Sequence, residues 1–298
     1  MGNPRRLLVT GGSGFLGWHV AQAARPGWDV MATFRTHAVD SPGIRQVQVD
    51  LTVSMELRHV FSRVHPDAVI HTAACSNINY CQTHRAEADR INRQVAVELA
   101  GLCANREIPF VFTSSDLVFD GERAPYREDD PVSPINAYGE GKAQAEREIL
   151  ERWPRALVCR LPPMFGAPAP GASGFLGPLV EAIRSRAPLR LFVDEFRTPV
   201  DVRSAAEGLL LGLEKASGLL HLGGPERTSR FDFGRLLLEA IGGRADLIVP
   251  VQQRDVPQKA PRPRDVSLDS ARARGLGFTP PPLREALADL ARELKGQS

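Results

Sequence analysis

Several features that often reveal a protein's class are scarce in this chain of 298 residues. Its four cysteines show no C-x-x-C spacing, which argues against a disulfide framework and indicates reduced thiols: Cys75, Cys81, Cys103 and Cys159. The 37 basic and 35 acidic residues leave a formal net charge of +2, so the composition gives no reason to expect a nucleic acid or a membrane surface as partner. No apolar run approaches the roughly 18 residues of a membrane span. The function must therefore be sought in individual sites.

Signals for targeting and for metal binding are also missing. The segment MGNPRRLLVTGG is too short before its glycines to hold a signal peptide, so we expect a cytoplasmic protein. The seven histidines include no H-E-x-x-H motif and no close cluster, and we expect no metal site. His71 stands in an apolar run, where packing in the core is its expected role.

The first half of the chain alternates short apolar runs with helical patterns. The runs predict strands over residues 6–10, 28–34, 45–51, 67–73, 109–115 and 156–161. The spacing between them predicts helices over residues 15–24, 54–66, 85–105 and 137–153. This alternation is typical of βαβ units, so we expect an α/β fold with a doubly wound parallel sheet of the Rossmann type.

The composition changes after Leu161. Residues 162–174 are rich in proline and glycine, which indicates a loop. Further helices are predicted over residues 175–186, 202–214, 231–242 and 282–295, and strands over 189–193 and 218–224. We expect one domain from residues 1–162, completed by about 198–224, and a smaller α/β substrate-binding lobe from residues 163–197 and 225–298.

A glycine-rich turn stands between the first predicted strand and the first predicted helix. In VTGGSGFLG, Gly11 allows a tight turn, Gly14 lets the backbone approach a pyrophosphate, and Gly17 lets the helix pack closely on the strand. A strand before the turn and a helix after it favour dinucleotide binding over a glycine-rich turn with no ligand. The first domain is therefore expected to bind a dinucleotide cofactor.

The end of the second predicted strand bears on which dinucleotide is bound. An NAD site usually has an acidic residue there for the ribose 2′-hydroxyl, but this strand ends in ATFRTH without a carboxylate. Arg35 is placed to pair with a 2′-phosphate, so we expect NADP, with NAD the less favoured cofactor. Asp50 is placed either to approach the adenine end or to cap the next turn. The residues expected to contact the cofactor are Gly11, Ser13, Gly14, Phe15, Leu16, Gly17, Arg35, Asp50, Leu51, Ala73, Ala74, Tyr138 and Lys142.

A tyrosine and a lysine stand four residues apart in NAYGEGKAQAE, on one face of a predicted helix. A phenol has a pKa near 10, and an ammonium one turn away is expected to lower it, so that Tyr138 with Lys142 can transfer a proton near neutral pH. A serine hydroxyl from the end of the preceding strand, TSSD, would hold a carbonyl oxygen against the phenol. Gly139 and Gly141 are expected to clear space for the cofactor and the substrate beside this helix.

These motifs resemble the extended short-chain dehydrogenase/reductases. TGGSGFLG matches their T-G-x-x-G-x-x-G pattern, and YGEGK matches Y-x-x-x-K. SSDLVFDG, SPINAYGEGK and RPRDVSLD are similar to patterns of the dTDP-4-dehydrorhamnose reductase branch, and the resemblance covers nearly the whole chain. It implies that Ser115 is the hydroxyl partner, Tyr138 the acid and Lys142 its electrostatic support. It also implies a structural or relay role for Asn92.

One departure from this branch concerns the substrate wall. The rhamnose-pathway enzymes commonly carry an aromatic residue where RLPPMFG has Pro163, and this segment is more similar to the methionine adenosyltransferase β-subunit. Two main functions therefore stay open, with a sugar-nucleotide epimerase or dehydratase as a third. One is NADPH-dependent reduction of the 4-keto group of a nucleotide-activated deoxysugar. The other is a non-catalytic NADP-binding regulator that docks on a partner enzyme.

The expected substrate contacts follow from the diphosphate of a sugar nucleotide. Arginine can grip a diphosphate through two parallel hydrogen bonds, and two arginines follow the ends of predicted elements in the second lobe. The residues expected to contact the substrate are Ser115, Asp116, Arg197 and Arg262. A plain surface position is the alternative for each arginine. The expected partners are the nucleotide sugar itself and either a second copy in a homodimer or a partner enzyme.

Overall fold

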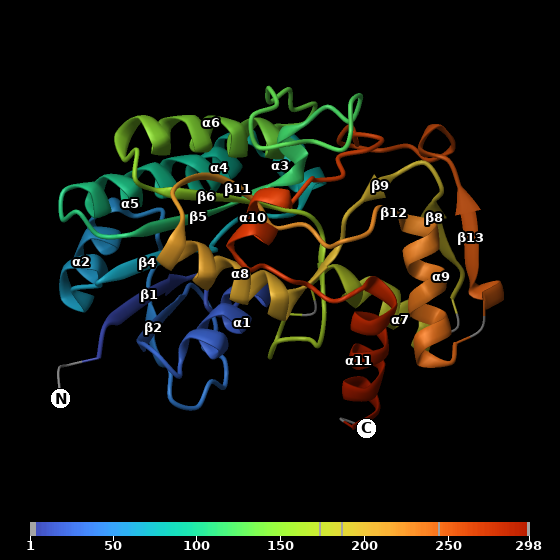
Figure 1. Cartoon of the computed structure of the whole chain (residues 1–298), viewed down its shortest axis with the longest axis horizontal. Coiled ribbons are helices and arrows are strands. Elements are labelled where there is room, and N and C mark those ends of the chain that lie inside the picture. Colours follow the sequence, from blue (N-terminus) through green and yellow to red (C-terminus); the bar gives the residue numbers. More distant parts are fainter. Residues whose placement is uncertain (1–3, 173, 186, 244, 297–298) are drawn as a thin grey trace.

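The computed structural model describes residues 4–172, 174–185, 187–243 and 245–296. Its centre is a seven-stranded parallel sheet in the order β11-β6-β5-β4-β1-β2-β3 (Figure 1). The strands are β1 (Arg6–Thr10), β2 (Asp29–Phe34), β3 (Arg45–Gln48), β4 (Ala68–His71), β5 (Phe110–Ser115), β6 (Leu157–Leu161) and β11 (Gly218–His221). The expected doubly wound parallel sheet of the Rossmann type is confirmed.

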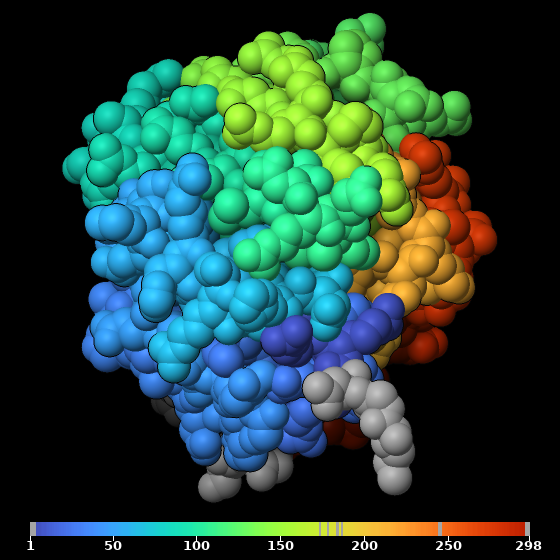
Figure 2. All heavy atoms as spheres, turned by 90° about the vertical axis from the view of Figure 1, so that its left-hand side faces the viewer, coloured from blue at the N-terminus to red at the C-terminus, as the bar shows by residue number. Residues whose placement is uncertain are grey.

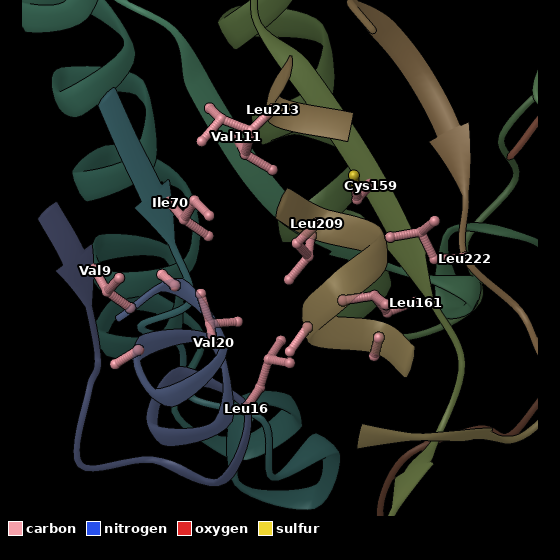
Figure 3. Close-up of a cluster of buried hydrophobic side chains, with 14 of the residues drawn as sticks. Val9, Leu16, Val20, Ile70, Val111, Cys159, Leu161, Leu209, Leu213 and Leu222 are labelled. Atoms are coloured by element: carbon pink, nitrogen blue, oxygen red, sulfur yellow. The ribbon is translucent and has the colours of Figure 1, made fainter. Parts of the chain in front are cut away.

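Helices cover both faces of this sheet. The helices α1 (Phe15–Ala24) and α8 (Val202–Lys215) pack on one face, with Val9, Ile70 and Leu209 in the core between them and the strands (Figure 3). The opposite face carries α2 (Ser54–Val64), α5 (Val95–Ala104) and α6 (Ala137–Arg152). Because both faces are covered, every residue of β4 is buried. This explains why the strands read as apolar runs rather than as alternating patterns.

The segment after β4 differs from its prediction. A short helix, α3 (Ile78–Thr83), begins where only a loop was expected, and the helix predicted over residues 85–105 is divided. It consists of α4 (Arg85–Asp89), a π-helical turn η1 (Arg90–Gln94) and α5. The wider π turn contains Asn92, whose amide binds the loop after β4. Such π turns are frequent at functional sites.

Most of the chain after β6, apart from α8 and β11, forms a lobe beside the sheet (Figure 1). Its strand β8 (Leu189–Phe192) pairs in parallel with β13 (Ile248–Val251), and α9 (Arg230–Ile241) packs against both. The C-terminal helix α11 (Leu283–Gly296) lies against α9 and shares an apolar core with it. The lobe therefore has a core separate from the two cores of the sheet. The assignment of the two regions to cofactor and substrate stays a prediction.

The remaining elements are short. They are η2 (Asp116–Val118), β7 (Met164–Phe165), η3 (Gly174–Leu176), α7 (Gly177–Arg184), β9 (Phe196–Arg197), β10 (Val200–Asp201), β12 (Thr228–Ser229), η4 (Ala245–Leu247), η5 (Gln253–Asp255) and α10 (Ala271–Leu276). Figure 2 shows the end of the molecule opposite the lobe, where segments of the first half cover nearly the whole face. Within the described ranges, no helix combines the length and the hydropathy that a bilayer crossing requires.

Most predicted elements of the first half begin and end within about two residues of the observed ones. The third strand is the exception, because β3 ends at Gln48 rather than at residue 51. In the second half, β13 and α10 were not predicted. Residue 186, the predicted end of a helix, lies outside the described residues, as do residues 1–3, 173, 244 and 297–298 of other predicted segments.

Candidate active site

The glycine turn joins β1 to α1 at the carboxyl edge of the sheet. Gly11 has a φ of +70°, and a side chain there would place its Cβ 2.7 Å from the Cα of Ala73. A Cβ at Gly17 would lie 2.2 Å from the carbonyl oxygen of Gly11. Both positions therefore need glycine, because β1, the loop after β4 and α1 meet there backbone to backbone.

The middle glycine has fewer neighbours and directly precedes the helix. A Cβ at Gly14 would have only one neighbour within 4 Å, the Gly11 carbonyl oxygen at 3.2 Å. Gly14 is also the N-cap of α1, and no side chain accepts a hydrogen bond from the first turn. The first backbone N–H groups of α1 are thus left for another acceptor, and a helix N-terminus favours an anion. This geometry fits the pyrophosphate of a dinucleotide.

The glycine turn lies at the point where the order of the strands reverses. β1 has β4 on one side and β2 on the other, and ligands of open α/β sheets bind in the crevice at such a point. The Thr10 hydroxyl contacts Nδ1 of His71 at 2.6 Å and ties the two strand ends together. His71 is fully buried, and burial lowers its pKa to about 3, so its ring is neutral. Its expected core role is confirmed.

Two candidate adenine-side residues lie after β2 and β3. Arg35 is exposed at the end of β2, and its carbonyl accepts a hydrogen bond from Gln48 at 3.0 Å. Asp50 accepts from the N–H of Thr52 at 2.9 Å and from its hydroxyl at 2.7 Å, which lowers the pKa of Asp50. Asp50 therefore caps the turn that precedes α2, one of its two expected roles. Leu51 is buried in the core under α2, so its side chain is structural.

The helix α6 begins with a capping residue that also reaches the lobe. The Asn136 side chain accepts from the N–H of Gly139 at 2.9 Å and donates to the carbonyl of Pro261 at 3.1 Å. A Cβ at Gly139 would lie 2.0 Å from the carbonyl oxygen of Leu117, whereas one at Gly141 would meet nothing within 4 Å. The prediction that both glycines clear space for ligands is therefore wrong for Gly139. That glycine lets α6 lie directly against the backbone after β5.

Lys142 lies one turn after Tyr138 and is buried beneath it. Its side chain donates a hydrogen bond to the Thr113 carbonyl at 2.8 Å, and its Nζ lies 4.5 Å from the Phe112 ring centroid and 5.8 Å from the Tyr138 ring centroid. Burial lowers the pKa of Lys142 to about 8. The ammonium is thus still the main form at neutral pH, close to the face of the phenol.

The phenol of Tyr138 is protonated at neutral pH. Burial raises its pKa, the nearby Asp116 carboxylate raises it further, and a hydrogen bond with the Ser115 hydroxyl opposes both. The expected lowering of this pKa by Lys142 is not found, because burial outweighs it and the ammonium is directed at the Thr113 carbonyl. A protonated phenol is suited to give a proton rather than to take one.

The two serines at the end of β5 point to different surroundings. Ser114 donates to the buried carboxylate of Glu146, which pairs with Arg160 at 2.8 Å. Ser115 instead accepts from the N–H of Leu117 at 3.2 Å and donates to Asp116 at 3.0 Å, on the side of the phenol. Successive residues of a strand face opposite sides. The structure therefore brings Ser115, and not Ser114, to Tyr138.

Asp116 follows directly and is almost fully buried, at 3% exposure. Burial raises its pKa to about 6, although the Arg197 guanidinium opposes the shift. Its Oδ2 lies 3.5 Å from Nε of Arg197 and has no hydrogen-bond partner among the described residues. A buried carboxylate oxygen without such a partner is uncommon and fits a ligand contact.

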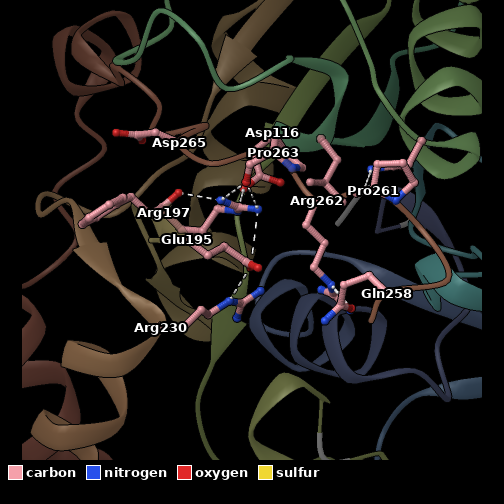
Figure 4. A network of polar contacts seen from close by, with 12 residues as sticks. Asp116, Glu195, Arg197, Arg230, Gln258, Pro261, Arg262, Pro263 and Asp265 are labelled. Atoms are coloured by element: carbon pink, nitrogen blue, oxygen red, sulfur yellow. Dashed lines mark hydrogen bonds and ion pairs between the residues drawn. The ribbon is translucent and has the colours of Figure 1, made fainter. Parts of the chain in front are cut away.

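Arg197 is the centre of a buried polar cluster (Figure 4). Its guanidinium donates to the carbonyls of Phe196 at 2.6 Å and Pro263 at 3.3 Å, and it lies 3.4 Å from Glu195. With 4% of its surface exposed and its guanidinium engaged by these protein groups, it has little room to grip a diphosphate, although it lines the small cavity beside Pro163. The interpretation of Arg197 as a diphosphate ligand is therefore not supported by its contacts, which instead position Asp116.

Two further arginines lie at the edge of this cluster. Arg262 was the second candidate substrate contact, and Arg230 was not indicated by the sequence. Arg262 is half-buried, donates to Gln258 at 2.9 Å, and has its pKa lowered by burial. Arg230, the first residue of α9, donates to Glu195 at 2.8 Å and lies 4.5 Å from the ring of Phe175. Its position after the N-cap Ser229 was a signal for a helix start but not for a ligand contact.

Pro163 lies in the segment that was expected to form the substrate wall. Pro163 shares a small cavity with Phe175, Arg230 and Phe233, so aromatic side chains of the lobe stand beside it. Asn92 has a structural role, because its amide accepts from the Cys75 N–H at 2.9 Å and donates to the Cys75 carbonyl at 3.1 Å.

The fold and this arrangement define a class: a Rossmann-type protein with the tyrosine and lysine pair of the short-chain dehydrogenase/reductases. Residues 5–295 match the family model described as the RmlD substrate binding domain. The chain belongs to this family.

The proteins similar to this chain include a named reductase and a named subunit of another enzyme. A probable low-salt glycan biosynthesis reductase of Haloferax volcanii is 32% identical over 291 residues, which are 95% of this chain and 96% of the relative. The methionine adenosyltransferase 2 subunit beta of Bos taurus is 29% identical, over 92% of this chain and 83% of the relative. The family therefore includes proteins named as reductases and proteins named as subunits of another enzyme.

Solved structures confirm the fold. A dTDP-4-dehydrorhamnose reductase of Bacillus anthracis, in complex with NADP, has a TM-score of 0.86 at 22% identity, over 97% of this chain and 99% of that one. A UDP-glucose 4-epimerase of Thermus thermophilus, in complex with NAD, has a TM-score of 0.85 at 21% identity, over 98% and 100%. Members of this fold thus bind either dinucleotide.

Proposed function

We propose that this protein is an NADPH-dependent reductase of the 4-keto group of a nucleotide-activated deoxysugar, acting in the cytoplasm. The observation that carries the proposal is the placement of Tyr138, with Ser115 beside it and Lys142 one turn below it. These three side chains lie at the carboxyl edge of the sheet, where the glycine turn also lies. A carbonyl placed there can accept a hydrogen bond and a proton from one side.

The proton step follows from these contacts. When bound, NADPH supplies the hydride that adds to the carbonyl carbon. When the substrate binds, Ser115 turns its hydroxyl proton from Asp116 to the carbonyl oxygen, and Tyr138 gives that oxygen its phenolic proton. Lys142 then stabilises the phenolate that is left, since its ammonium lies 5.8 Å from the ring centroid. General acid catalysis of this kind contributes roughly 10²–10⁴-fold in rate.

The cofactor is held by the glycine turn and the residues around it. The uncapped start of α1 at Gly14 binds the pyrophosphate, and the loop after β4, with Ala73 and Ala74, borders the nicotinamide half. Arg35 selects NADP by pairing with the 2′-phosphate. Support for this selection comes from its exposed place after β2 and from the missing acid there.

The substrate is held between β5 and the lobe. Asp116 accepts a sugar hydroxyl through Oδ2, which lies 3.5 Å from Arg197 but accepts no hydrogen bond among the described residues. Arg262, half-buried at the edge of the arginine cluster, binds the diphosphate, while the buried Arg197 positions Asp116. This division uses a partly exposed arginine and leaves the ion pairs of Arg197 intact.

A second candidate function is a non-catalytic NADP-binding regulator that docks on a partner enzyme. It is favoured by Pro163 and by the similarity to a methionine adenosyltransferase subunit. A sugar-nucleotide epimerase or dehydratase is a third, less favoured function, because the sequence relatives named above are a reductase and a subunit of another enzyme.

The test supplies purified protein with NADPH and a panel of dTDP-4-dehydro-6-deoxyhexoses made fresh by a dehydratase. We expect NADPH absorbance to decay with at least one sugar and the product to carry a new hydroxyl. If the absorbance stays flat with every sugar while NADPH binds, the reductase proposal fails and the regulator is favoured. A homodimer or a complex with a partner enzyme is then sought by light scattering and affinity capture.

A further inference from the structure

Two cysteine side chains lie in contact beside the candidate active site and have no role in the proposed reaction. Cys75 stands in the loop after β4, and Cys81 lies in α3. Their sulfur atoms are 3.6 Å apart, and the Cys81 thiol also lies 3.2 Å from the Cys75 carbonyl oxygen. We propose that Cys75 and Cys81 form a peroxide-sensitive dithiol site, in which Cys75 is oxidised first and Cys81 closes a disulfide with it.

The two thiols differ in exposure as this order of oxidation steps requires. Cys75 is half-buried and can be reached by a small peroxide, whereas Cys81 has 0% exposure and can react only with its neighbour. The Cys81 S–H donates to the Cys75 sulfur, and this lowers the pKa of Cys75 and raises that of Cys81. The thiolate is the reactive form, so Cys75 is the nucleophile.

The remaining cysteines provide an internal comparison. Cys103 and Cys159 are fully buried in the apolar cores, and burial raises the pKa of each thiol. Among the described residues, neither of these two thiols is exposed, and neither has another sulfur as a hydrogen-bond partner. Peroxide is therefore expected to oxidise one pair and to spare the other two thiols.

The chemistry balances with a peroxide as the only added reactant. The Cys75 thiolate attacks one oxygen of hydrogen peroxide, the O–O bond breaks, and hydroxide leaves a sulfenic acid on Cys75. The Cys81 sulfur then attacks the Cys75 sulfur, an S–S bond forms, and water leaves with the Cys81 proton. The two thiols are oxidised by two electrons in total, and the peroxide is reduced to two waters.

The position of the pair connects it to the cofactor site. Cys75 is two residues from Ala73, which packs directly on the glycine turn. A Cβ built at Gly11 would lie 2.7 Å from the Cα of Ala73. A disulfide needs the sulfurs at about 2.05 Å, so closing it draws the Cys75 loop toward α3. The Asn92 amide holds the same loop through both backbone groups of Cys75. We infer that the disulfide displaces the loop beside the glycine turn and weakens NADPH binding, an effect that rests on the proposed function.

The first measurement needs no activity. Reduced full-length protein is treated with hydrogen peroxide, alkylated and digested with trypsin. Both cysteines fall in one peptide, residues 64–85, because no lysine or arginine lies between Arg63 and Arg85. We expect this peptide to lose about 2 Da and to escape alkylation until a reductant is added. If both thiols in it are still alkylated while another cysteine is oxidised, the proposal is overturned.

Single variants separate the two roles. In Cys81→Ser, peroxide should leave a sulfenic acid on Cys75 that dimedone traps, and in Cys75→Ser the peptide should stay unmodified. Cys103→Ser, far from the pair, is the matched control and should form the disulfide like the wild type. Dimedone labelling of Cys81 in Cys75→Ser would contradict the order of the two steps.

The second measurement compares NADPH dissociation constants of the reduced and oxidised protein by fluorescence titration. We expect weaker binding after oxidation and recovery after reduction, in the wild type and in Cys103→Ser but not in Cys75→Ser. An unchanged dissociation constant with the disulfide fully formed would overturn the link to the cofactor site. If the reduced protein itself binds no NADPH, the proposed function fails while the peptide measurement still decides the thiol chemistry.

Discussion

The two sides of the candidate site are built in different ways. On the sheet side, the glycine turn is shaped by backbone contacts, since a side chain at Gly11 or Gly17 would collide with neighbouring main chain. On the lobe side, the arrangement depends on buried charge, because Arg197 lies between Asp116 and Glu195. A backbone site tolerates many side-chain changes around it, whereas a buried charge cluster is sensitive to the loss of one member. Substitutions on the two sides should therefore have different consequences.

The largest effect is expected from Tyr138→Phe, on the sheet side. The substitution keeps the ring and removes only the hydroxyl, so kcat should fall by roughly 10²–10⁴-fold while folding and NADPH binding change little. Steady-state kinetics and a cofactor titration on the same preparation measure both quantities. Turnover near the wild-type rate would show that Tyr138 is not the acid.

On the lobe side, Arg197→Met should act on folding instead. Removal of the guanidinium leaves the buried carboxylates of Asp116 and Glu195 with fewer opposing charges, and losing one member of a buried pair typically costs about 3–5 kcal/mol. Arg262→Met is the matched control, since its guanidinium is only half-buried and its loss should raise KM more than it destabilises the fold. Urea unfolding of both variants decides between the two roles. Equal stability would mean that the cluster does not hold the lobe.

The pH dependence of reduction should report Lys142 rather than the phenol. The pKa of Lys142 is lowered to about 8, so the ammonium is present below that pH and is lost above it, whereas the raised pKa of Tyr138 keeps the phenol protonated. We expect kcat to decline about tenfold per pH unit above pH 8, as for a single ionisation. In Lys142→Met this decline should vanish at a lower overall rate. A decline that persists in the variant would assign it to another group.

A smaller effect is expected for the cofactor preference. The charge-assisted pair between Arg35 and a 2′-phosphate should be worth roughly 1.5–3 kcal/mol, or about 10–100-fold in the NADPH dissociation constant. Arg35→Ala should therefore weaken NADPH binding and leave NADH binding unchanged. Calorimetric titration with both cofactors measures the ratio. Equal affinity of the wild type for NADPH and NADH would remove the basis for the NADP assignment.

The sheet side was also the more predictable side, for a physical reason. Gly11, Gly14 and Gly17 act through the local backbone, and Tyr138 and Lys142 are joined by one helical turn, so their relation is encoded in a few consecutive residues. The arginine cluster instead joins η2, β9, α9 and the segment after η5, which are far apart in the sequence. No local pattern indicates which arginine becomes buried.

Predictions about charge states depended in the same way on tertiary contacts. The Tyr138–Lys142 spacing was read correctly, but the direction of the phenol pKa was not, because the spacing contains no information on burial or on the Asp116 carboxylate. The π turn at Asn92 was likewise missed, since its amide binds the backbone of Cys75, which lies 17 residues earlier in the chain. Local geometry follows from local sequence, whereas electrostatics follows from the packed structure.

The last comparison lies within α6, where two glycines two residues apart have different surroundings. In Gly139→Ala the new methyl group would meet the Leu117 carbonyl oxygen at 2.0 Å, and this rigid backbone contact should destabilise the fold by about 1–3 kcal/mol. In Gly141→Ala the methyl group meets nothing within 4 Å, so the higher helix propensity of alanine should stabilise the protein by about 0.5–1 kcal/mol. Thermal unfolding without ligands separates the pair. If the Gly141→Ala variant is more stable but has a raised KM for substrate or NADPH, the open space beside Gly141 is occupied by a ligand. Unchanged kinetics would mean that this glycine has no functional role.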